Sequence, residues 1–96
     1  MQIGIDVGAT KIESVVLEID GKEQHRSRTE CPKEYNKIIK TVKEINDSLE
    51  KKLNKILPIG VCHPGIHSQQ TGFVKNAPNC YWLEKKPFQQ DLRKLL

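Results

Sequence analysis

The chain has 96 residues, of which 36% are hydrophobic and 29% are charged. This length fits at most one small domain, which would bury roughly 60 to 65% of the unfolded chain's surface. The formal net charge of +4 comes from 16 Lys and Arg against 12 Asp and Glu, spread along the chain without a block of like charges. We therefore expect neither a nucleic acid nor a membrane as the partner, and no apolar run approaches the ~18 residues of a membrane span.

The cysteines indicate a reducing compartment. Cys31, Cys62 and Cys80 are odd in number and irregular in spacing. The chain does not open with a positively charged segment followed by an apolar stretch, as a secretory signal would. We therefore expect reduced thiols in a soluble, cytoplasmic protein.

Three antiparallel strands are expected at the start of the chain. The first covers residues 2–6, and the second covers residues 12–19, which are rich in β-branched side chains. Asp20 and Gly21 then suit the two positive-φ positions of a type I′ turn. A polar third strand at 22–29 would lie at an edge of the sheet, where Lys and Arg discourage pairing with other chains.

Beyond Pro32 the hydrophobic period changes from two residues to three and four. This period predicts an α-helix that runs to about Asn54 and lays one face on the sheet. Its apolar residues are Tyr35, Ile38, Ile39, Val42, Ile45, Leu49 and Leu53. The apolar run 56–62 predicts a short buried strand, parallel to the first, although Pro58 argues against its first residues being central in a ladder.

The last third of the chain is expected to be irregular until a final helix. Turn signals at 63–65, 70–72 and 77–79 surround a brief extended piece at 73–75. Pro87 can occupy a first helical turn, after which Phe88, Leu92, Leu95 and Leu96 share one face. The helix stops on this unfinished face without a Gly or Asn cap, so we expect the chain to be a piece of a longer protein.

The opening stretch "IDVGATK" carries the most specific chemistry. A turn through Gly8 would expose backbone N–H groups that can bind phosphate, with the Thr10 hydroxyl and the Lys11 charge beside them. A carboxylate at Asp6 would repel phosphate unless a cation lay between them, and Mg²⁺ held through water is the natural mediator. The alternative is an ordinary hairpin with a glycine loop and exposed charges.

This stretch, between the first two strands of a meander, resembles the first phosphate motif of the actin and sugar-kinase superfamily. More narrowly, it resembles the ROK family of bacterial sugar kinases and repressors. "GVCHPG" at 60–65 is similar to that family's Gly-x-x-x-Pro-Gly strand end. "TGFVKNAPNCYWLEKKPFQQDL" is similar to the segment with its sugar-contacting Asn, especially in the fructokinase-like branch.

The resemblance implies a fold and a reaction. The fold would be part of the N-terminal domain of a ribonuclease H-like, actin-type ATPase, of mixed α+β or α/β class. It would contain a three-stranded antiparallel meander, a crossover helix, a parallel fourth strand and a C-terminal helix, with the second domain absent. The reaction would be transfer of the γ-phosphate of ATP to a hexose hydroxyl with Mg²⁺.

The resemblance also assigns residues to roles. Asp6 would meet Mg²⁺ through water, and the β- and γ-phosphates would be lined by Gly8, Ala9, Thr10 and Lys11. Family members usually have Gly where Ala9 stands.

On the sugar side, Gly65 would let the backbone pass close to the sugar, and Asn79 would bind a sugar hydroxyl. Pro78 stands as one extra residue before that Asn, which leaves Asn76 as the alternative. Trp82 and Leu83 are expected to be packing residues.

Several parts of such a kinase are missing from these 96 residues. The general-base Asp, the Glu-x-x-Gly-His segment, the Cys-rich zinc site and the second domain do not occur. Phosphoryl transfer depends on positioning and charge stabilisation, so we expect no kinase activity from this chain alone.

Other interpretations remain open at this stage. A non-catalytic, sugar-responsive regulator is the alternative function, although the first strand begins at residue 2 and leaves no room for a preceding DNA-binding domain. A homodimer that covers an exposed edge is a further possibility. Zinc could be held by Cys62, His63, His67 and Cys80, but the spacing fits no common pattern, and we expect loop histidines with buried, inert thiols instead. The Lys-rich helix face is expected to be solvated.

Overall fold

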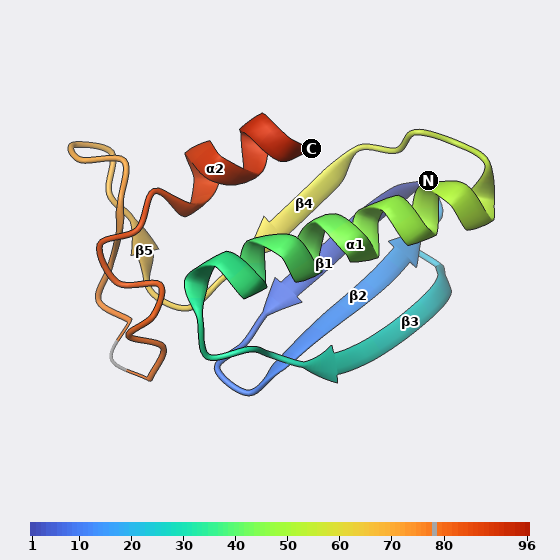
Figure 1. Ribbon diagram of the computed structural model, residues 1–96. Helices are drawn as coiled ribbons and strands as arrows, with labels where there is room; N and C mark the ends of the chain where they lie inside the picture. Colours follow the sequence, from blue (N-terminus) through green and yellow to red (C-terminus); the bar gives the residue numbers. More distant parts are fainter. Residues whose placement is uncertain (78) are drawn as a thin grey trace.

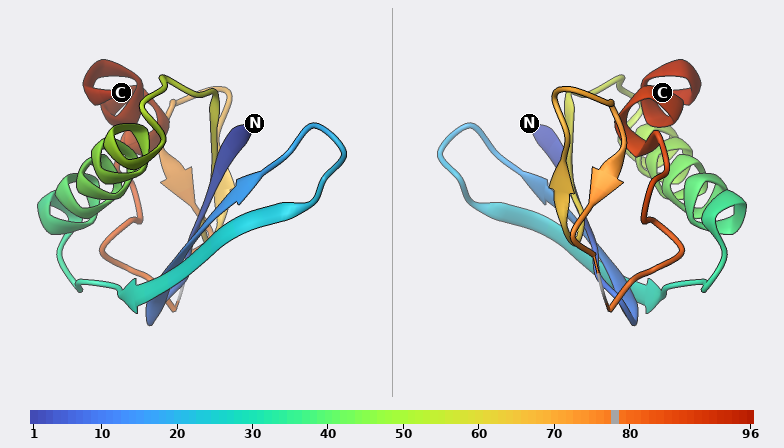
Figure 2. Two further views of the ribbon diagram at one scale, coloured as in Figure 1. Left: turned by 90° about the vertical axis from the view of Figure 1, so that its right-hand side faces the viewer. Right: turned by 90° about the vertical axis from the view of Figure 1, so that its left-hand side faces the viewer.

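A computed structural model of the chain describes residues 1–77 and 79–96. Its centre is a four-stranded mixed sheet in the order β3-β2-β1-β4 (Figure 1). These strands are β1 (Gln2–Val7), β2 (Lys11–Leu17), β3 (Glu23–Glu30) and β4 (Ile59–Cys62). The helices α1 (Tyr35–Leu53) and α2 (Phe88–Leu95) lie on the same side of this sheet (Figure 2).

The predicted meander is confirmed. β1 pairs antiparallel with β2, which pairs antiparallel with β3, and β1 pairs parallel with β4. Side chains alternate between the two faces, as the pleat requires. The face toward the helices is buried and the opposite face is open. The buried residues of β1 and β2 are Ile3, Ile5, Val7, Ile12, Ser14 and Val16.

The turn between β2 and β3 differs from the prediction. Of Asp20 and Gly21, only Gly21 has a positive φ, of 87°. A type I′ turn needs a positive φ at both central positions, so these residues do not form one. Instead residues 19–21 form a three-residue loop, in which the Gly21 N–H donates to Glu18 O at 2.9 Å. Farther along the ladder the register shifts between Val16 and Leu17, because Leu17 pairs with Glu23 and Val16 with His25, which leaves Gln24 as an extra residue in β3. β2 therefore ends at Leu17, and Ile19 is exposed.

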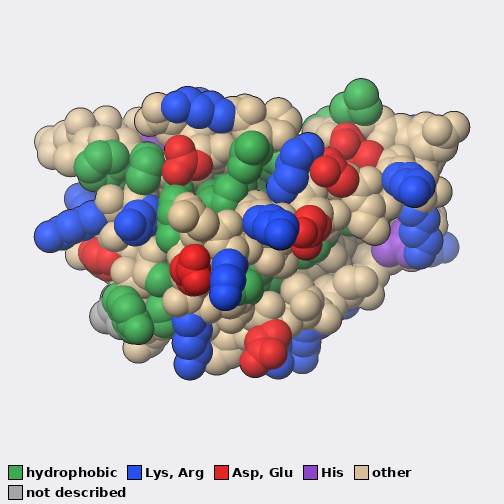
Figure 3. Space-filling model, in the orientation of Figure 1, with side chains coloured by type: hydrophobic (Ala, Val, Ile, Leu, Met, Phe, Trp, Pro, Cys, Tyr) green, Lys and Arg blue, Asp and Glu red, His purple; other side chains and the backbone are tan. Residues whose placement is uncertain are grey.

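The crossover helix begins and ends close to its predicted positions. Ile38, Ile39, Val42 and Asn46 are its buried residues. Asn54 follows in the left-handed conformation, with φ of 54°, and its N–H satisfies carbonyls of the last turn. Lys and Asp or Glu alternate over the outer surface of the helix (Figure 3), and Lys43 pairs with Asp47 at 2.9 Å. The solvated character of the Lys-rich face is thus confirmed.

β4 is not the buried strand that the run 56–62 predicts. It begins only at Ile59, and Ile56 is 91% exposed. β4 is the outer strand of the sheet within the described residues, so Gly60 and Cys62 face solvent while Ile59 and Val61 are half-buried toward α2. The Pro58 carbonyl accepts a bond from the Ile3 N–H at 2.9 Å, and Pro58 stays outside the ladder as expected.

The last third contains one element that the sequence did not predict. β5 (Ile66–His67) pairs antiparallel with β6 (Val74–Lys75), which corresponds to the expected extended piece. The final helix α2 follows Pro87 directly, and Phe88 and Leu92 are buried. Leu95 and Leu96 complete its apolar face but remain partly exposed. The predicted turn at 77–79 includes Pro78, which lies outside the described residues.

A hydrogen bond and an aromatic contact join the two helices. The Tyr35 hydroxyl donates to the Asp91 carboxylate at 2.6 Å, and the Tyr35 ring meets Phe88 edge-on. Burial, with the Asp91 carboxylate as hydrogen-bond partner, raises the pKa of Tyr35 above its ordinary value.

Within the described residues, neither helix has the length and apolar character to cross a bilayer.

Candidate functional site

The candidate phosphate loop is the tip of the β1–β2 hairpin. The strands lie antiparallel on both sides of it, as the motif requires. The Gly8 N–H donates to Lys11 O at 2.8 Å, so this amide is not bare, contrary to the expectation for the whole loop. At the tip, Thr10 is exposed and Ala9 half-buried. Neither of these two N–H groups donates to a described residue of the chain.

Gly8 is required by a close backbone approach. A Cβ at this position would lie 2.9 Å from the Lys11 carbonyl oxygen, closer than real Cβ contacts. Any larger residue would therefore push the two arms of the hairpin apart. The glycine closes the turn tightly, and the Ala9 and Thr10 amides are the ones at the tip that do not donate to a described residue.

Asp6 is the last outward-facing residue of β1 and lies opposite Glu13 on β2. Glu13 is already neutralised, because its carboxylate pairs with Arg26 at 2.8 Å and with Arg28 at 2.7 Å. Asp6 is exposed, and its one hydrogen bond to a described residue comes from the Cys62 thiol at 3.7 Å. Asp6 thus presents hard oxygen atoms at the end of the strand.

This donor set fits a hydrated magnesium ion. The described residues include no cluster of three or more His, Cys, Asp or Glu able to enclose a metal. Mg²⁺ usually keeps several waters and takes one or two carboxylates together with phosphate oxygens, so a single exposed Asp suits it. Cys62, His63, His67 and Cys80 do not form such a cluster in the part of the chain that the structure describes.

The three thiols are free, and two of them are buried. Cys62 is the exception to the expected burial, because it lies on the open face of the edge strand. Partial desolvation of its sulfur and the Asp6 carboxylate beside it raise the pKa of Cys62. A raised thiol pKa favours the protonated sulfur, which is the less reactive form.

The parallel pairing of β1 and β4 brings the two candidate half-sites to one edge of the sheet. Asp6 is in register with Cys62, and each is at or next to the carboxyl end of its strand. The phosphate hairpin and the His63–Gly65 turn therefore leave the sheet side by side (Figure 1). Ligands of open α/β sheets bind beyond the carboxyl ends of parallel strands.

Gly65 and the 75–77 backbone are in close contact. Gly65 has a φ of 80°, and a Cβ there would lie 2.5 Å from Lys75 O and 3.0 Å from the Ala77 Cβ. Two residues beyond Ala77, Asn79 is exposed, and the Cys80 N–H donates to Ala77 O at 3.1 Å. Asn76 is also exposed, with a left-handed φ of 58°. Leu83 is fully buried and Trp82 packs against the core, as expected.

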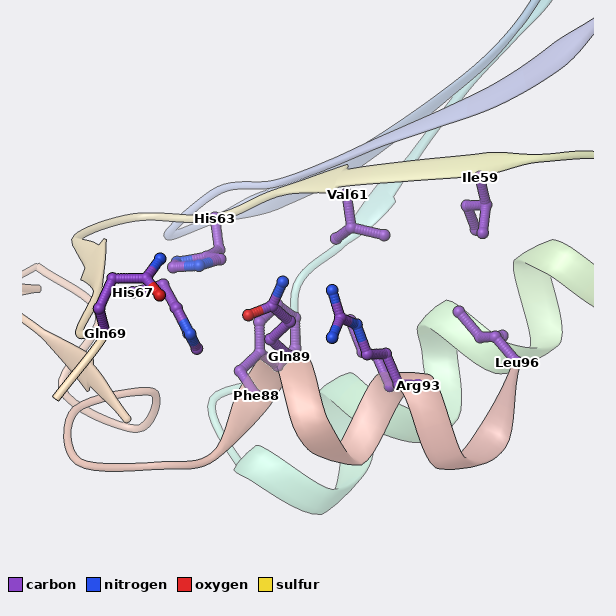
Figure 4. A pocket seen from close by; sticks show the side chains of 10 residues that line it. Ile59, Val61, His63, His67, Gln69, Phe88, Gln89, Arg93 and Leu96 are labelled. Carbon is purple, nitrogen blue, oxygen red and sulfur yellow. The ribbon is translucent and has the colours of Figure 1, made fainter. Parts of the chain in front are cut away.

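A cavity of about 620 Å³ lies between β4 and α2, and no sequence pattern indicated it. Its lining combines residues from β4, from the stretch 63–69 and from the C-terminal helix, so only the tertiary structure assembles it. In Figure 4, Arg93 and Gln89 reach from α2 toward the half-buried side chains of β4, with His63 and His67 at one end. The His63 ring lies edge-on against Phe88, with centroids 5.3 Å apart.

The mixed sheet, its crossover helix and the hairpin after the first strand define an actin-like ATPase fold. The sequence profile of the ROK family matches residues 2–96, and the chain belongs to this family. The N-acetyl-D-glucosamine kinase of Haemophilus influenzae (strain 86-028NP) is 29% identical over 93 residues, which are 96% of this chain and 30% of that protein.

Solved structures share the fold. A ROK hexokinase from Thermus thermophilus superposes with a TM-score of 0.80 at 21% identity, over 98% of this chain and 31% of that one. A ROK family glucokinase from Streptomyces griseus, in complex with glucose and AMPPNP, gives a TM-score of 0.80 at 20% identity, over 97% and 29%. The chain spans less than a third of the length of each of these three proteins.

Proposed function

We propose that the chain forms the nucleotide-binding and part of the sugar-binding half of an ATP-dependent hexose kinase. The observation that carries the proposal is the parallel register of β1 and β4, which sets the phosphate hairpin beside the Gly65 turn. Nucleotide and sugar bound at these two places would meet beyond one edge of the sheet. Such proximity is the chief requirement of phosphoryl transfer.

On the nucleotide side, the amides of Ala9 and Thr10 bind terminal phosphate oxygens, together with the Lys11 charge. Gly8 keeps the turn closed through its bond to Lys11 O. Asp6 holds a Mg²⁺ ion through water, and the ion neutralises charge on the transferring phosphate when bound. The AMPPNP complex of the Streptomyces griseus glucokinase supports an adenine nucleotide as the ligand.

On the sugar side, Gly65 allows close approach of the backbone and Asn79 binds a hydroxyl. Two sugars are candidates for the substrate. The similarity to N-acetyl-D-glucosamine kinases supports N-acetylglucosamine. The fructokinase-like form of the 71–92 segment supports fructose, with the 6-hydroxyl as acceptor.

The test is titration calorimetry of Mg-AMPPNP into the 96-residue protein. We expect weak binding that Asp6→Asn abolishes, because the amide cannot compensate the charge of the ion. The matched control is Asp47→Asn, an exposed aspartate on α1 whose partner is Lys43. Equal heats for the wild type and Asp6→Asn would reject the proposed magnesium role.

Turnover is the second measurement. Coupled assays with N-acetylglucosamine, fructose, glucose and mannose should show no activity, because the chain lacks a general base for the sugar hydroxyl. Robust activity that needs both ATP and a sugar would overturn this expectation. Salt-dependent binding to duplex DNA would instead favour the regulator.

A further inference from the structure

The segment Val74–Lys86 is a loop closed at its base. The Val74 N–H donates to Lys86 O at 2.9 Å, and the Lys85 N–H donates to Val74 O at 2.7 Å. The chain therefore returns to its starting point after about ten residues, and Asn79 lies between the two ends. Compact loops of this kind are filled by their own side chains. Those buried here are Ala77, Cys80 and Leu83.

One carboxylate holds the backbone inside this loop. Glu84 Oε1 accepts the Asn76 N–H at 3.0 Å, and Glu84 Oε2 accepts the Ala77 N–H at 2.8 Å. Two consecutive amides that converge on one anion form a concave site of the type that binds phosphate or carboxylate. Such bonds to an ionised acceptor are stronger than neutral ones.

The carboxylate acts where the backbone is in unfavourable conformations. Asn76 has a φ of 58° and Lys85 a φ of 61°, in the left-handed region that most non-glycine residues avoid, although Asn tolerates it better than Lys. Residues persist there only when their surroundings fix them. Glu84 directly precedes Lys85 and contacts Asn76, so its two bonds join both unfavourable positions.

Gly65, in the turn after β4, packs closely against the same stretch of backbone. The absent Cβ of Gly65 leaves room for Lys75 O and for the Ala77 methyl group. The stretch 75–77 is therefore fixed by the Glu84 carboxylate and by the turn after β4. A shift of this stretch would disturb its packing against Gly65 shortly before the chain reaches Asn79.

We propose that Glu84 is a positioning residue for sugar binding: its carboxylate fixes the backbone of Asn76 and Ala77, which packs against Gly65 and lies two residues before Asn79. Glu84 does not itself touch the sugar. This inference rests on the sugar-binding role of Asn79 in the proposed function. The chemistry makes Gln an inadequate substitute, because a carboxamide has one acceptor oxygen for the two N–H groups.

The first readout is independent of any ligand. In two-dimensional NMR spectra of the 96-residue protein, the amide protons of Asn76 and Ala77 should shift as the Glu84 carboxyl is protonated at low pH. In Glu84→Gln these two titrations should disappear. Glu44→Gln is the matched control, because Glu44 is exposed on α1 and far from the loop in sequence.

The second readout is affinity for N-acetylglucosamine and fructose, beside Mg-AMPPNP. Glu84→Gln should weaken sugar binding by about tenfold or more, since small displacements of a binding group have effects of this size. Mg-AMPPNP affinity should be unchanged, and Glu84→Asp, which keeps both oxygens, should restore part of the sugar affinity. If Glu84→Gln does not fold, Glu84→Asp carries the same comparison.

The outcomes separate this inference from the proposed function. If the wild type binds a sugar and Glu84→Gln binds it equally well, the positioning role is wrong and the proposed function stands. If the wild type binds none of the sugars, both sugar roles fail. The amide titrations then still show whether Glu84 holds the loop.

Discussion

The two candidate half-sites are built in different ways. The candidate phosphate hairpin is closed by a bond between Gly8 and Lys11, three residues apart, and the ladder between β1 and β2 fixes its arms. The proposed sugar loop, residues 74–86, depends on the bond between Glu84 and Asn76, eight residues apart, and on the packing of Gly65 against Lys75. The geometry of the hairpin is therefore set by residues that are close in the chain. The geometry of the loop depends on contacts between residues farther apart, so the loss of one such contact should disturb it.

The strongest test of this difference is Phe88→Ala. Phe88 is 1% exposed and its ring meets both Tyr35 and His63. The substitution should lower the free energy of unfolding by about 3–5 kcal/mol. In hydrogen exchange, amides of 74–92 should lose protection while those of β1 and β2 keep theirs.

The control is Phe73→Ala, whose ring is 42% exposed and whose loss should be much smaller. Equal loss of protection throughout the chain would show that the two regions unfold as one unit.

Gly65→Ala should have the next largest effect. The new Cβ would meet Lys75 O and would require a left-handed residue, so we expect a loss of about 2–4 kcal/mol in unfolding free energy. Gly72→Ala is the matched control for Gly65→Ala. Gly72 also has a positive φ, of 76°, but a Cβ there would have nothing within 4 Å. The control substitution should cost about 1–2 kcal/mol. Similar values in urea unfolding would show that Gly65 is not closely packed.

Alkaline pH should loosen the sugar loop. Burial, with the Cys31 thiol as a lesser cause, raises the pKa of Cys80 from 9.0 to about 11. The unfolded chain therefore releases this proton earlier than the folded one, so stability is unaffected below pH 9 and falls between pH 9 and 11.

Melting temperatures of Cys80→Ala should decline less steeply over this range than those of the wild type. Parallel declines would mean that Cys80 titrates alike in the folded and unfolded states.

The smallest effect is expected in the hairpin. Ala9→Gly removes a methyl group at the tip, where ROK family members usually have Gly. We expect Mg-AMPPNP to bind about two- to fivefold more tightly, a change of less than about 1 kcal/mol. Calorimetry should show this gain without a change in sugar affinity. Weaker nucleotide binding would indicate that the added freedom of glycine outweighs the gain in space.

The meander and the crossover helix could be read from the sequence because their signals repeat. Alternating apolar residues in β1 and β2, and the three- and four-residue steps of α1, each report a buried face many times over. The type I′ turn was wrong because Asp20 and Gly21 suit several turns, and here the hydrogen bonds between Glu18 and Lys22 and from Gly21 to Glu18 close a three-residue loop instead. β4 was wrong in its burial because an apolar run does not tell whether a second neighbour covers it.

Sequence alone determined the order of the elements, the family resemblance and the position of the phosphate hairpin, since these depend on neighbouring residues. Only the tertiary structure decided that Glu13 pairs with two arginines while Asp6 has no ion-pair partner among the described residues, that the Glu84 carboxylate accepts two backbone amides, and that β4 and α2 enclose a cavity. Each of these contacts joins different parts of the chain, and no pattern in the sequence indicates which parts will meet. The physical reason is that hydrogen bonds and charge pairs depend on distance in space, which periodicity does not encode.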